Sequence, residues 1–274
     1  MTNRWLKGVA IAALTATGTM AAQAADLPTR KEAPAPVFVP PPFTWTGFYV
    51  GLNAGGVIGS GNRTTSLYAP GIASWIATYY PNNLGSSPSG FIGGGQAGYN
   101  WQTGAFVLGV ETDFDGTTLS KTFNYTSPAF AVGTPFPGDI LSVNAKANLD
   151  WLGTTRARLG FVATPDNRLM IYATGGVAYG GGSSNFSAFD TRNDFFLSGS
   201  PSSSRVGWTI GAGAEYAITN NITIKGEYLY YNLGSTSVTS SPTGLFASQF
   251  PNVVATTKYT FDGSIIRAGV NYKF

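Results

Sequence analysis

The chain has 274 residues, of which 36 are Gly, 14% are aromatic and 11% are charged, and it contains no Cys or His. The absence of both residue types excludes a Ser-His-Asp or Cys-His nucleophile and a conventional zinc or histidine-ligated haem site. The formal charge of +3 identifies no partner by itself. We therefore expect no enzyme activity, no cofactor and no metal site. The high content of Gly and aromatic residues favours a strand-rich chain with many turns.

Residues 1–24 have the pattern of a secretory signal peptide. Arg4 and Lys7 precede an apolar run from Val9 to Ala16, and Ala22-Gln23-Ala24 supplies the small residues of a cleavage site. A transmembrane anchor, the alternative, needs about 20 apolar residues, more than this run contains. Removal of residues 1–24 takes away Arg4 and Lys7 and lowers the formal charge from +3 to +1. We therefore expect no nucleic-acid partner.

Residues 25–44 are dense in Pro and Ala from Leu27 to Pro42. Pro cannot donate to a β-ladder, and such a segment buries too little apolar surface to form a core. The composition predicts an extended periplasmic tail over residues 25–44, with the folded part over residues 45–274.

From Trp45 onward the chain repeats one pattern, a segment of about ten residues with two-residue alternation followed by a turn. The predicted strands are Trp45–Gly56, Gly90–Gln102, Ala105–Asp115, Asn144–Phe161, Arg168–Tyr179, Arg205–Ile218, Ile222–Leu233 and Lys258–Phe274. Short connections alternate with long ones that start near Val57, Gly116, Gly180 and Gly234. This rhythm predicts an all-β protein, an eight-stranded antiparallel up-and-down transmembrane β-barrel with four long outer loops and short periplasmic turns.

One face of each predicted strand is apolar, and we place no charged residue on it. An example is Phe106, Leu108, Val110 and Phe114 in the third strand. Because a charge facing lipid at the bilayer midplane costs about 2–4 kcal/mol, this face is suited to hydrocarbon. The aromatic residues fall mostly near strand ends, where an interfacial girdle places them. We expect the cell outer membrane as the location and its lipid as the surroundings of the barrel.

The opposite face gathers the charged residues, interleaved with Gly. The expected lumen charge network consists of Glu111, Asp113, Asp115, Asp150, Arg156, Arg158, Glu215, Lys225, Glu227 and Arg267. Lys146 and Lys273 lie on the same predicted face and bring it to six charges of each sign. Charges in a narrow lumen must pair or stay hydrated, and an eight-stranded interior is just wide enough for side chains. The pattern predicts a lumen largely closed by salt bridges.

Two further motifs resemble sites of other chemistries. Gly93-Gly94-Gly95-Gln96-Ala97-Gly98 matches a dinucleotide-binding pattern formally, but it leads into a strand where that pattern requires a helix. Glu111-Thr112-Asp113-Phe114-Asp115-Gly116 resembles the start of a calcium loop, yet Thr122 stands where the bidentate Glu belongs. A third alternative is that these carboxylates form the catalytic pair of a glycosidase. We favour the lumen network over all three.

The chain ends in alternating apolar and aromatic residues, Ala268 to Phe274. An ordinary edge strand would explain this ending. Because a secretory signal stands at the other end, we favour a C-terminal assembly signal carried by Tyr272 and Phe274, for the barrel-assembly machinery that acts during biogenesis.

Several segments together resemble the small porin-like outer-membrane β-barrels of alphaproteobacteria, which include major surface immunogens and haemin-binding proteins. The matching segments are Trp45–Gly51, Leu149–Gly160, Tyr172–Gly176, Gly207–Tyr216 and the ending at Phe274. The resemblance covers Trp45 to Phe274. It implies an eight-stranded barrel similar in shape to the transmembrane domain of outer-membrane protein A, with roles in envelope structure, surface antigenicity, small-solute permeability or haemin binding. It supplies no catalytic residues, and without His it leaves Tyr as the protein ligand for haem iron.

Four hypotheses follow. The first is an envelope barrel with a structural and surface-contact role. The second is a small porin for limited solute diffusion, although open channels usually need about sixteen strands. The third is a module that binds haemin, a host ligand or another small molecule through the outer loops, with Trp75, Tyr79, Tyr80 and Phe250 as candidate contacts. The fourth is a soluble periplasmic β-sandwich, which would pack its apolar faces on each other.

Overall fold

A computed structural model of the chain describes residues 42–60, 63–68, 70, 79, 87–134, 137–191, 196–199, 202–241, 247–248 and 252–274. All of them belong to one compact unit, Pro42–Phe274. The predicted signal peptide and nearly all of the predicted Pro-rich tail lie outside the described residues. In the described part, no helix has both the length and the apolar character needed to cross a membrane.

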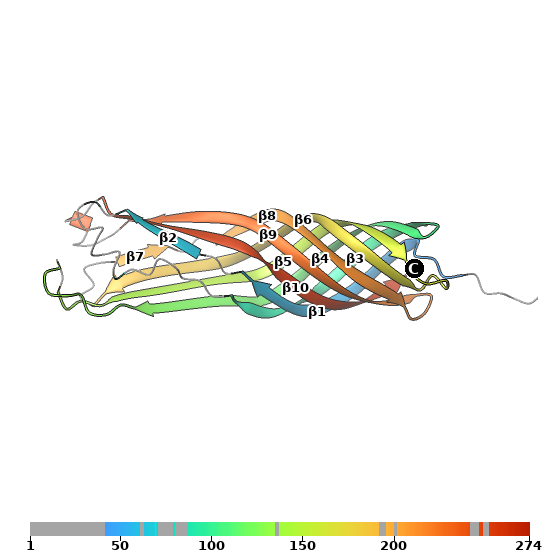
Figure 1. The fold of residues 1–274 in the computed structure, drawn as a ribbon, viewed down its shortest axis with the longest axis horizontal. Helices are drawn as coiled ribbons and strands as arrows, with labels where there is room; N and C mark the ends of the chain where they lie inside the picture. Colours follow the sequence, from blue (N-terminus) through green and yellow to red (C-terminus); the bar gives the residue numbers. More distant parts are fainter. Residues whose placement is uncertain are drawn as a thin grey trace, which may run out of the picture. The chain divides into compact units, whose positions relative to one another are not determined.

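The fold is a closed ring of eight antiparallel strands (Figure 1). The ring strands are β1 (Gly47–Gly59), β3 (Ser89–Thr103), β4 (Phe106–Thr126), β5 (Leu141–Val162), β6 (Leu169–Asp190), β8 (Ser202–Ala217), β9 (Ile222–Ser240) and β10 (Val254–Lys273). Each strand pairs with its neighbour in chain order, and β10 pairs with β1 from Tyr49 opposite Lys273 to Gly59 opposite Gly263, which closes the ring. The predicted fold class is confirmed.

Two short strands add to this ring. They are β2 (Arg63–Tyr68), which pairs with the start of β10, and β7 (Phe196–Gly199), which pairs with the end of β6. Both lie at the end of the barrel opposite the C-terminus (Figure 1). We call this end the loop end. The end with the C-terminus and the three short turns is called the terminal end.

Several strands continue past their predicted loop-end limits. β4 runs to Thr126 and pairs with β5 as far as Ser142, while β6 reaches Asp190. The apolar alternation ends near Gly116 and Gly180, but the backbone ladder continues, because strand pairing in water needs hydrogen bonds and not an apolar face. The apolar alternation in the sequence therefore indicates where lipid contact ends, whereas the backbone hydrogen bonds show where strand pairing ends.

The strand register shifts where the lipid-facing part of the barrel ends and the loop-end extensions of the strands begin. Shifts occur between Gly116 and Leu119 on β4, between Ala147 and Trp151 on β5, and between Thr260 and Asp262 on β10. Opposite the last shift, Gly234 of β9 has a φ of +79°, a conformation that favours Gly. On β5 the buried positions change from even-numbered residues such as Leu152 to odd-numbered ones such as Leu149, so the predicted inner face of this strand holds only on the terminal side of its shift.

The terminal end is closed by tight turns. Gly104, between β3 and β4, and Asn167, between β5 and β6, both have a φ of +60°, which Gly and Asn adopt most readily. In the second turn, hydrogen bonds from the Thr164 hydroxyl and the Arg168 backbone N–H lower the pKa of Asp166. These short connections agree with the predicted turns.

Two bands of aromatic side chains surround the outside of the barrel. Near the terminal end, Phe48 packs against Phe274 with ring centroids 5.8 Å apart, and Phe106 packs against Phe161 at 5.8 Å. Near the loop end, Phe114 stacks on Trp151 at 5.4 Å. Among the described residues between these bands, the outward side chains are uncharged, and large ones such as Leu52, Val110 and Ile266 are exposed. This exterior has the pattern of a transmembrane barrel.

Candidate functional site

The lumen is filled by the inward side chains of all eight ring strands, in layers that follow the chain. On β9 the inward positions read Thr223, Lys225, Glu227, Leu229 and Tyr231 from the terminal end, and each of them is buried. On β9, polar groups therefore lie nearer the terminal end and apolar groups nearer the loop end. On β4, β5 and β8 an apolar residue precedes the polar groups at the terminal end, so the lumen as a whole has three layers.

The first layer is a plug at the terminal end. It consists of buried Phe43, Trp45, Val107, Val162, Met170, Tyr172 and Ala217. Trp45 is 1% exposed, and its indole Nε1 donates to the Asn167 carbonyl at 2.8 Å. Phe43 packs edge-on against Trp45, with ring centroids 5.0 Å apart. Phe43 was predicted to belong to the tail. It packs into the barrel instead, because its apolar ring is buried against Trp45 and the other side chains of the plug.

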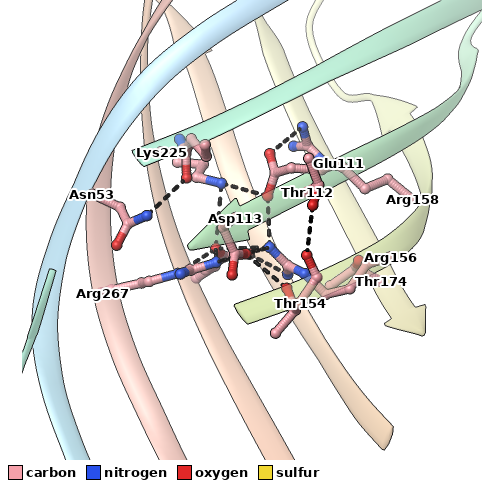
Figure 2. Close-up of polar contacts among 12 residues, drawn as sticks. Asn53, Glu111, Thr112, Asp113, Thr154, Arg156, Arg158, Thr174, Lys225 and Arg267 are labelled. Carbon is pink, nitrogen blue, oxygen red and sulfur yellow. Dashed lines mark hydrogen bonds and ion pairs between the residues drawn. The ribbon is translucent and has the colours of Figure 1, made fainter. Parts of the chain in front are cut away.

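The second layer is a buried charge network around Arg156 (Figure 2). Its members are Glu111, Asp113, Asp115, Arg156, Arg158, Glu215, Lys225, Glu227 and Arg267. Arg156 donates to Glu111 at 2.6 Å, to Asp113 at 2.9 Å and to Glu227 at 2.9 Å. Lys225 lies 2.8 Å from Glu111. These contacts connect β4, β5 and β9 across the lumen.

Arg267 of β10 forms the loop-end side of the network. It contacts Asp113 at 2.7 Å, Asp115 at 2.6 Å and Glu227 at 2.7 Å. Asp113 Oδ2 also accepts a hydrogen bond from the Thr154 hydroxyl at 2.7 Å. Removal of Arg267 would leave buried Asp115 without a cation and take one cation partner each from Asp113 and Glu227, which is costlier than losing a surface ion pair.

Arg158 forms the terminal side of the network. It donates to Glu215 at 2.7 Å, and its guanidinium lies over the Tyr172 ring, 3.9 Å from the centroid. The same guanidinium donates to the Tyr49 hydroxyl at 2.7 Å, and that hydroxyl donates to Glu111 at 2.7 Å. Tyr49 and Tyr172 therefore hold Arg158 between the plug and the central ion pairs.

A chain of side-chain amides runs beside the network. Asn271 donates to Glu215 at 2.8 Å, Gln96 donates to Asn271 at 2.5 Å, and Asn53 donates to Gln96 at 3.3 Å. We call Asn53, Gln96 and Asn271 the amide chain. It connects β1, β3 and β10 where Gly residues leave room for long side chains.

The third layer is apolar and lies on the loop-end side of the charges. It consists of Val57, Ile92, Leu119, Leu149, Leu152, Ala178, Leu229, Tyr231, Leu233 and Ile265, all buried. Beyond it, a cavity of about 60 Å³ is lined by residues that include Lys121, Tyr259 and Asp262.

Nine of the ten residues predicted for the lumen charge network lie in it, and Asp150 does not. Asp150 is exposed, because the register shift between Ala147 and Trp151 turns it outward. The placement of Asp150 in the lumen was wrong. Lys146, on the same side of that shift, is also exposed. Lys273 lies at the terminal mouth, where its amino group is 5.7 Å from the centroid of the Phe43 ring.

Sequence reasoning missed the uncharged partners of the network. Tyr49, Tyr172, Thr154 and the amide chain all occupy inward positions of their strands. The two-residue alternation does indicate that these side chains point inward. Tyr49, for example, stands between outward Phe48 and Val50. Their pairwise contacts depend on the strand register, which the alternation alone does not give.

The predicted assembly residues lie at the end of the last strand. The Phe274 backbone N–H donates to the Phe48 carbonyl at 3.0 Å, and the Phe274 ring lies 5.2 Å from the Tyr272 ring. Both side chains are exposed and belong to the aromatic band near the terminal end. They are therefore accessible from the lipid side of the barrel.

The arrangement favours a structural role for these carboxylates over the other chemistries considered. Gly93–Gly98 lies inside β3 and continues into further strand, so it does not open a helix as a dinucleotide site requires. Glu111 pairs with Arg156, Arg158 and Lys225, Asp113 pairs with Arg156 and Arg267, and both carboxylates are buried in the lumen. Among the described residues, no group of three or more Asp or Glu is arranged to hold a metal ion.

Comparisons with known proteins agree with the barrel. Residues 10–274 match the family described as outer membrane protein beta-barrel domain. The 31 kDa outer-membrane immunogenic protein of Brucella melitensis biotype 1 is 38% identical over 98% of this chain and 100% of its own length. The 22 kDa outer membrane protein of Rhizobium leguminosarum bv. viciae is 30% identical over 73% of this chain and 68% of its own.

Among solved structures, the outer membrane protein OprG of Pseudomonas aeruginosa aligns with 85% of this chain and 98% of its own, at 12% identity and a TM-score of 0.44.

Proposed function

Because this chain belongs to the outer membrane protein β-barrel domain family, we propose that it is an envelope barrel with a closed lumen and a structural and surface-contact role. Its location is the outer membrane. The observation that supports the closed lumen is the uninterrupted stack of buried side chains formed by the plug, the charge network and the apolar layer. An eight-stranded interior is narrow enough for side chains to fill it.

The stack opposes ions and small solutes in different ways. The plug and the apolar layer consist mainly of apolar groups and offer few hydrogen-bond partners to a hydrated ion. Between them, the charges of the network already bind one another at 2.6 to 3.3 Å, so a passing ion would have to displace an internal partner. A path through the lumen would need all three layers to open together.

The surface-contact role is supported by the loop-end extensions. β4, β5 and β6 continue well beyond the loop-end aromatic band marked by Phe114, Trp151 and Tyr179. At about 3.4 Å per residue, the ten steps from Gly116 to Thr126 add roughly 34 Å of strand. Rigid pairing at this length presents the connecting segments away from the lipid surface.

Loop aromatics remain candidates for ligand contact in this proposal. Of those named from the sequence, Trp75, Tyr80 and Phe250 lie outside the described residues. Tyr79 packs on Phe130 with ring centroids 4.7 Å apart, and its hydroxyl accepts the Ala131 N–H at 3.1 Å. This contact favours a packing role for Tyr79 over a role in binding haemin or a host ligand.

A solute-uptake assay tests the closed lumen. Proteoliposomes that contain the mature barrel should swell in isotonic small sugars no faster than empty liposomes. As a control for insertion, the same vesicles should show the heat-dependent gel mobility typical of folded barrels. Rapid swelling in proportion to the amount of folded barrel would favour the porin hypothesis instead.

The biogenesis partner also belongs to this proposal. The exposed Tyr272 and Phe274 side chains at the end of β10 support recognition by the barrel-assembly machinery from the lipid side. The position of these residues adds support, because the pairing of β10 with β1 completes the ring.

A further inference from the structure

The charge network contains more carboxylates than cations. Among the described residues it holds five carboxylates, Glu111, Asp113, Asp115, Glu215 and Glu227, and four cations, Arg156, Arg158, Lys225 and Arg267. With every group ionised, its formal charge is 4 − 5 = −1. Lys121 lies six residues farther along β4 than Asp115 and lines the loop-end cavity. An unbalanced charge in a sealed interior is strongly unfavourable, so the network should acquire one positive charge.

The hydrogen-bond direction of the amide chain shows where a donor is needed. Glu215 accepts hydrogen bonds from Arg158 and from the Thr223 hydroxyl. Because Glu215 is an acceptor, its partner Asn271 donates to it through the side-chain NH2 group. Asn271 then accepts from Gln96, and Gln96 accepts from Asn53. Asn53 Oδ1 is left as a buried acceptor with no donor among the described residues. The amide chain therefore requires a hydrogen-bond donor beside Asn53 Oδ1.

Asp115 lies at that end. Asn53 pairs with Gly94 of β3, and Gly94 pairs with Asp115 of β4, so only a Gly separates the two side chains along the sheet. Asp115 Oδ1 fills this gap, because a Cβ on Gly94 would come within 2.5 Å of it. In the described part of the chain this oxygen also has no hydrogen-bond partner. Two buried acceptors without donors thus belong to neighbouring side chains.

We propose that the sealed lumen binds one proton at Asp115, carried on Oδ1 and donated to Asn53 Oδ1. The proton forms an O–H bond on the carboxyl group and brings the formal charge of the network to zero. It also converts two unsatisfied acceptors into one hydrogen bond. Asp115 Oδ2 continues to accept from Arg267 at 2.6 Å.

The surroundings select Asp115 over the other carboxylates. Glu111 and Glu227 each contact three cations. Asp113 Oδ1 also has no hydrogen-bond partner among the described residues, but Asp113 contacts two cations whereas Asp115 contacts one. Glu215 contacts one cation and accepts two further hydrogen bonds. Asp115 has Arg267 of β10 as its cation partner, with Asp113 beside it on β4, Arg156 on β5 and apolar Leu152 opposite it.

Infrared spectroscopy of the mature barrel in lipid at neutral pH tests the proposal. We expect the stretching band of one protonated carboxylic acid. The band should shift when aspartate is isotopically labelled at its carboxyl carbon, disappear in Asp115→Asn and persist in Asp166→Asn, which alters an exposed turn. A water that bridges Asp115 and Asn53 would leave all five carboxylates ionised. The absence of the band in wild type, or its survival in Asp115→Asn, would overturn the proposal.

A second variant separates charge balance from local geometry. Asp113→Asn removes one carboxylate, so four cations face four carboxylates and Asp115 should release its proton. The acid band should then disappear although Asp115 is present, and a band that persists would contradict the charge argument. If Asp115→Asn does not fold, the wild-type spectrum with labelled aspartate still shows whether an aspartic acid is protonated, and the absence of a label-sensitive acid band overturns the proposal. The inference rests on the closed lumen, but a non-conducting barrel without the band would contradict the proton site alone.

Discussion

Arg156 Nη1 on β5 lies 2.9 Å from Glu227 Oε2 on β9, a contact that crosses the lumen between strands three positions apart in the ring. Neither side chain is exposed to solvent. A contact of this kind ties two walls of the barrel together. It also makes the stability of the fold depend on a few interior charges.

Replacement of Arg156 by Met should strongly destabilise the barrel. Three carboxylates lose a buried partner, and breaking a buried pair typically costs about 3–5 kcal/mol. The measurement is the free energy of unfolding in urea, with the protein in lipid vesicles. Lys258→Met changes an exposed residue of β10 and should stay within about 0.5 kcal/mol of wild type. Equal effects of the two variants would contradict the role assigned to Arg156.

A charge on the lipid face should have a depth-dependent cost. Val110 lies on β4 midway between Phe106 and Phe114 of the two aromatic bands. We expect Val110→Arg to destabilise the barrel by about 2–4 kcal/mol. Thr122→Arg, on the same strand but beyond the loop-end band, should cost less than about 1 kcal/mol. The same unfolding titration measures both, and a reversed order would contradict the placement of the bands.

The packing of Tyr49 predicts a sensitive Gly. A Cβ at Gly98 would lie 2.4 Å from the Tyr49 hydroxyl and 2.6 Å from the Val110 carbonyl. Gly98→Ala should therefore destabilise the barrel by about 1–3 kcal/mol, since Tyr49 must leave Glu111 and Arg158. Gly226→Ala is the matched control, because a Cβ there meets nothing within 4 Å. Thermal unfolding followed by gel mobility compares the two, and a cost confined to Gly226→Ala would exclude this account.

The end of the chain should matter for assembly more than for stability. Deletion of Phe274 removes an exposed ring and one backbone bond to Phe48. We expect a marked fall in the amount of folded barrel in cells, with refolding into detergent close to wild type. Heat-dependent gel mobility of envelope fractions and of refolded samples measures both. Equal loss in the two settings would indicate a purely structural role for Phe274.

The sequence predicted the barrel and most of its lumen, because inward and outward residues alternate strictly where one face meets lipid. Arg156, Glu227 and Arg267 could be assigned inward by counting positions. Asp150 could not, since a register shift separates it from the lipid-facing part of β5.

The contacts within the lumen were beyond sequence reasoning for a related reason. The pairing of Arg267 with Asp115 depends on the register of four strands, from β10 through β1 and β3 to β4. The two-residue alternation assigns a face but does not give the offset between strands. The network holds five carboxylates and four cations because Asp150, Lys146 and Lys273 all lie outside it, although the alternation had placed six charges of each sign on the inner face.

Single-barrel conductance in planar lipid bilayers tests the closed lumen most directly. The mature barrel should insert without steady current steps, because the plug, the charge network and the apolar layer block the lumen in series. As a positive control, a porin of about sixteen strands in the same bilayer should give open steps. Steady steps from the monomeric wild-type barrel, large enough for hydrated ions, would contradict the account.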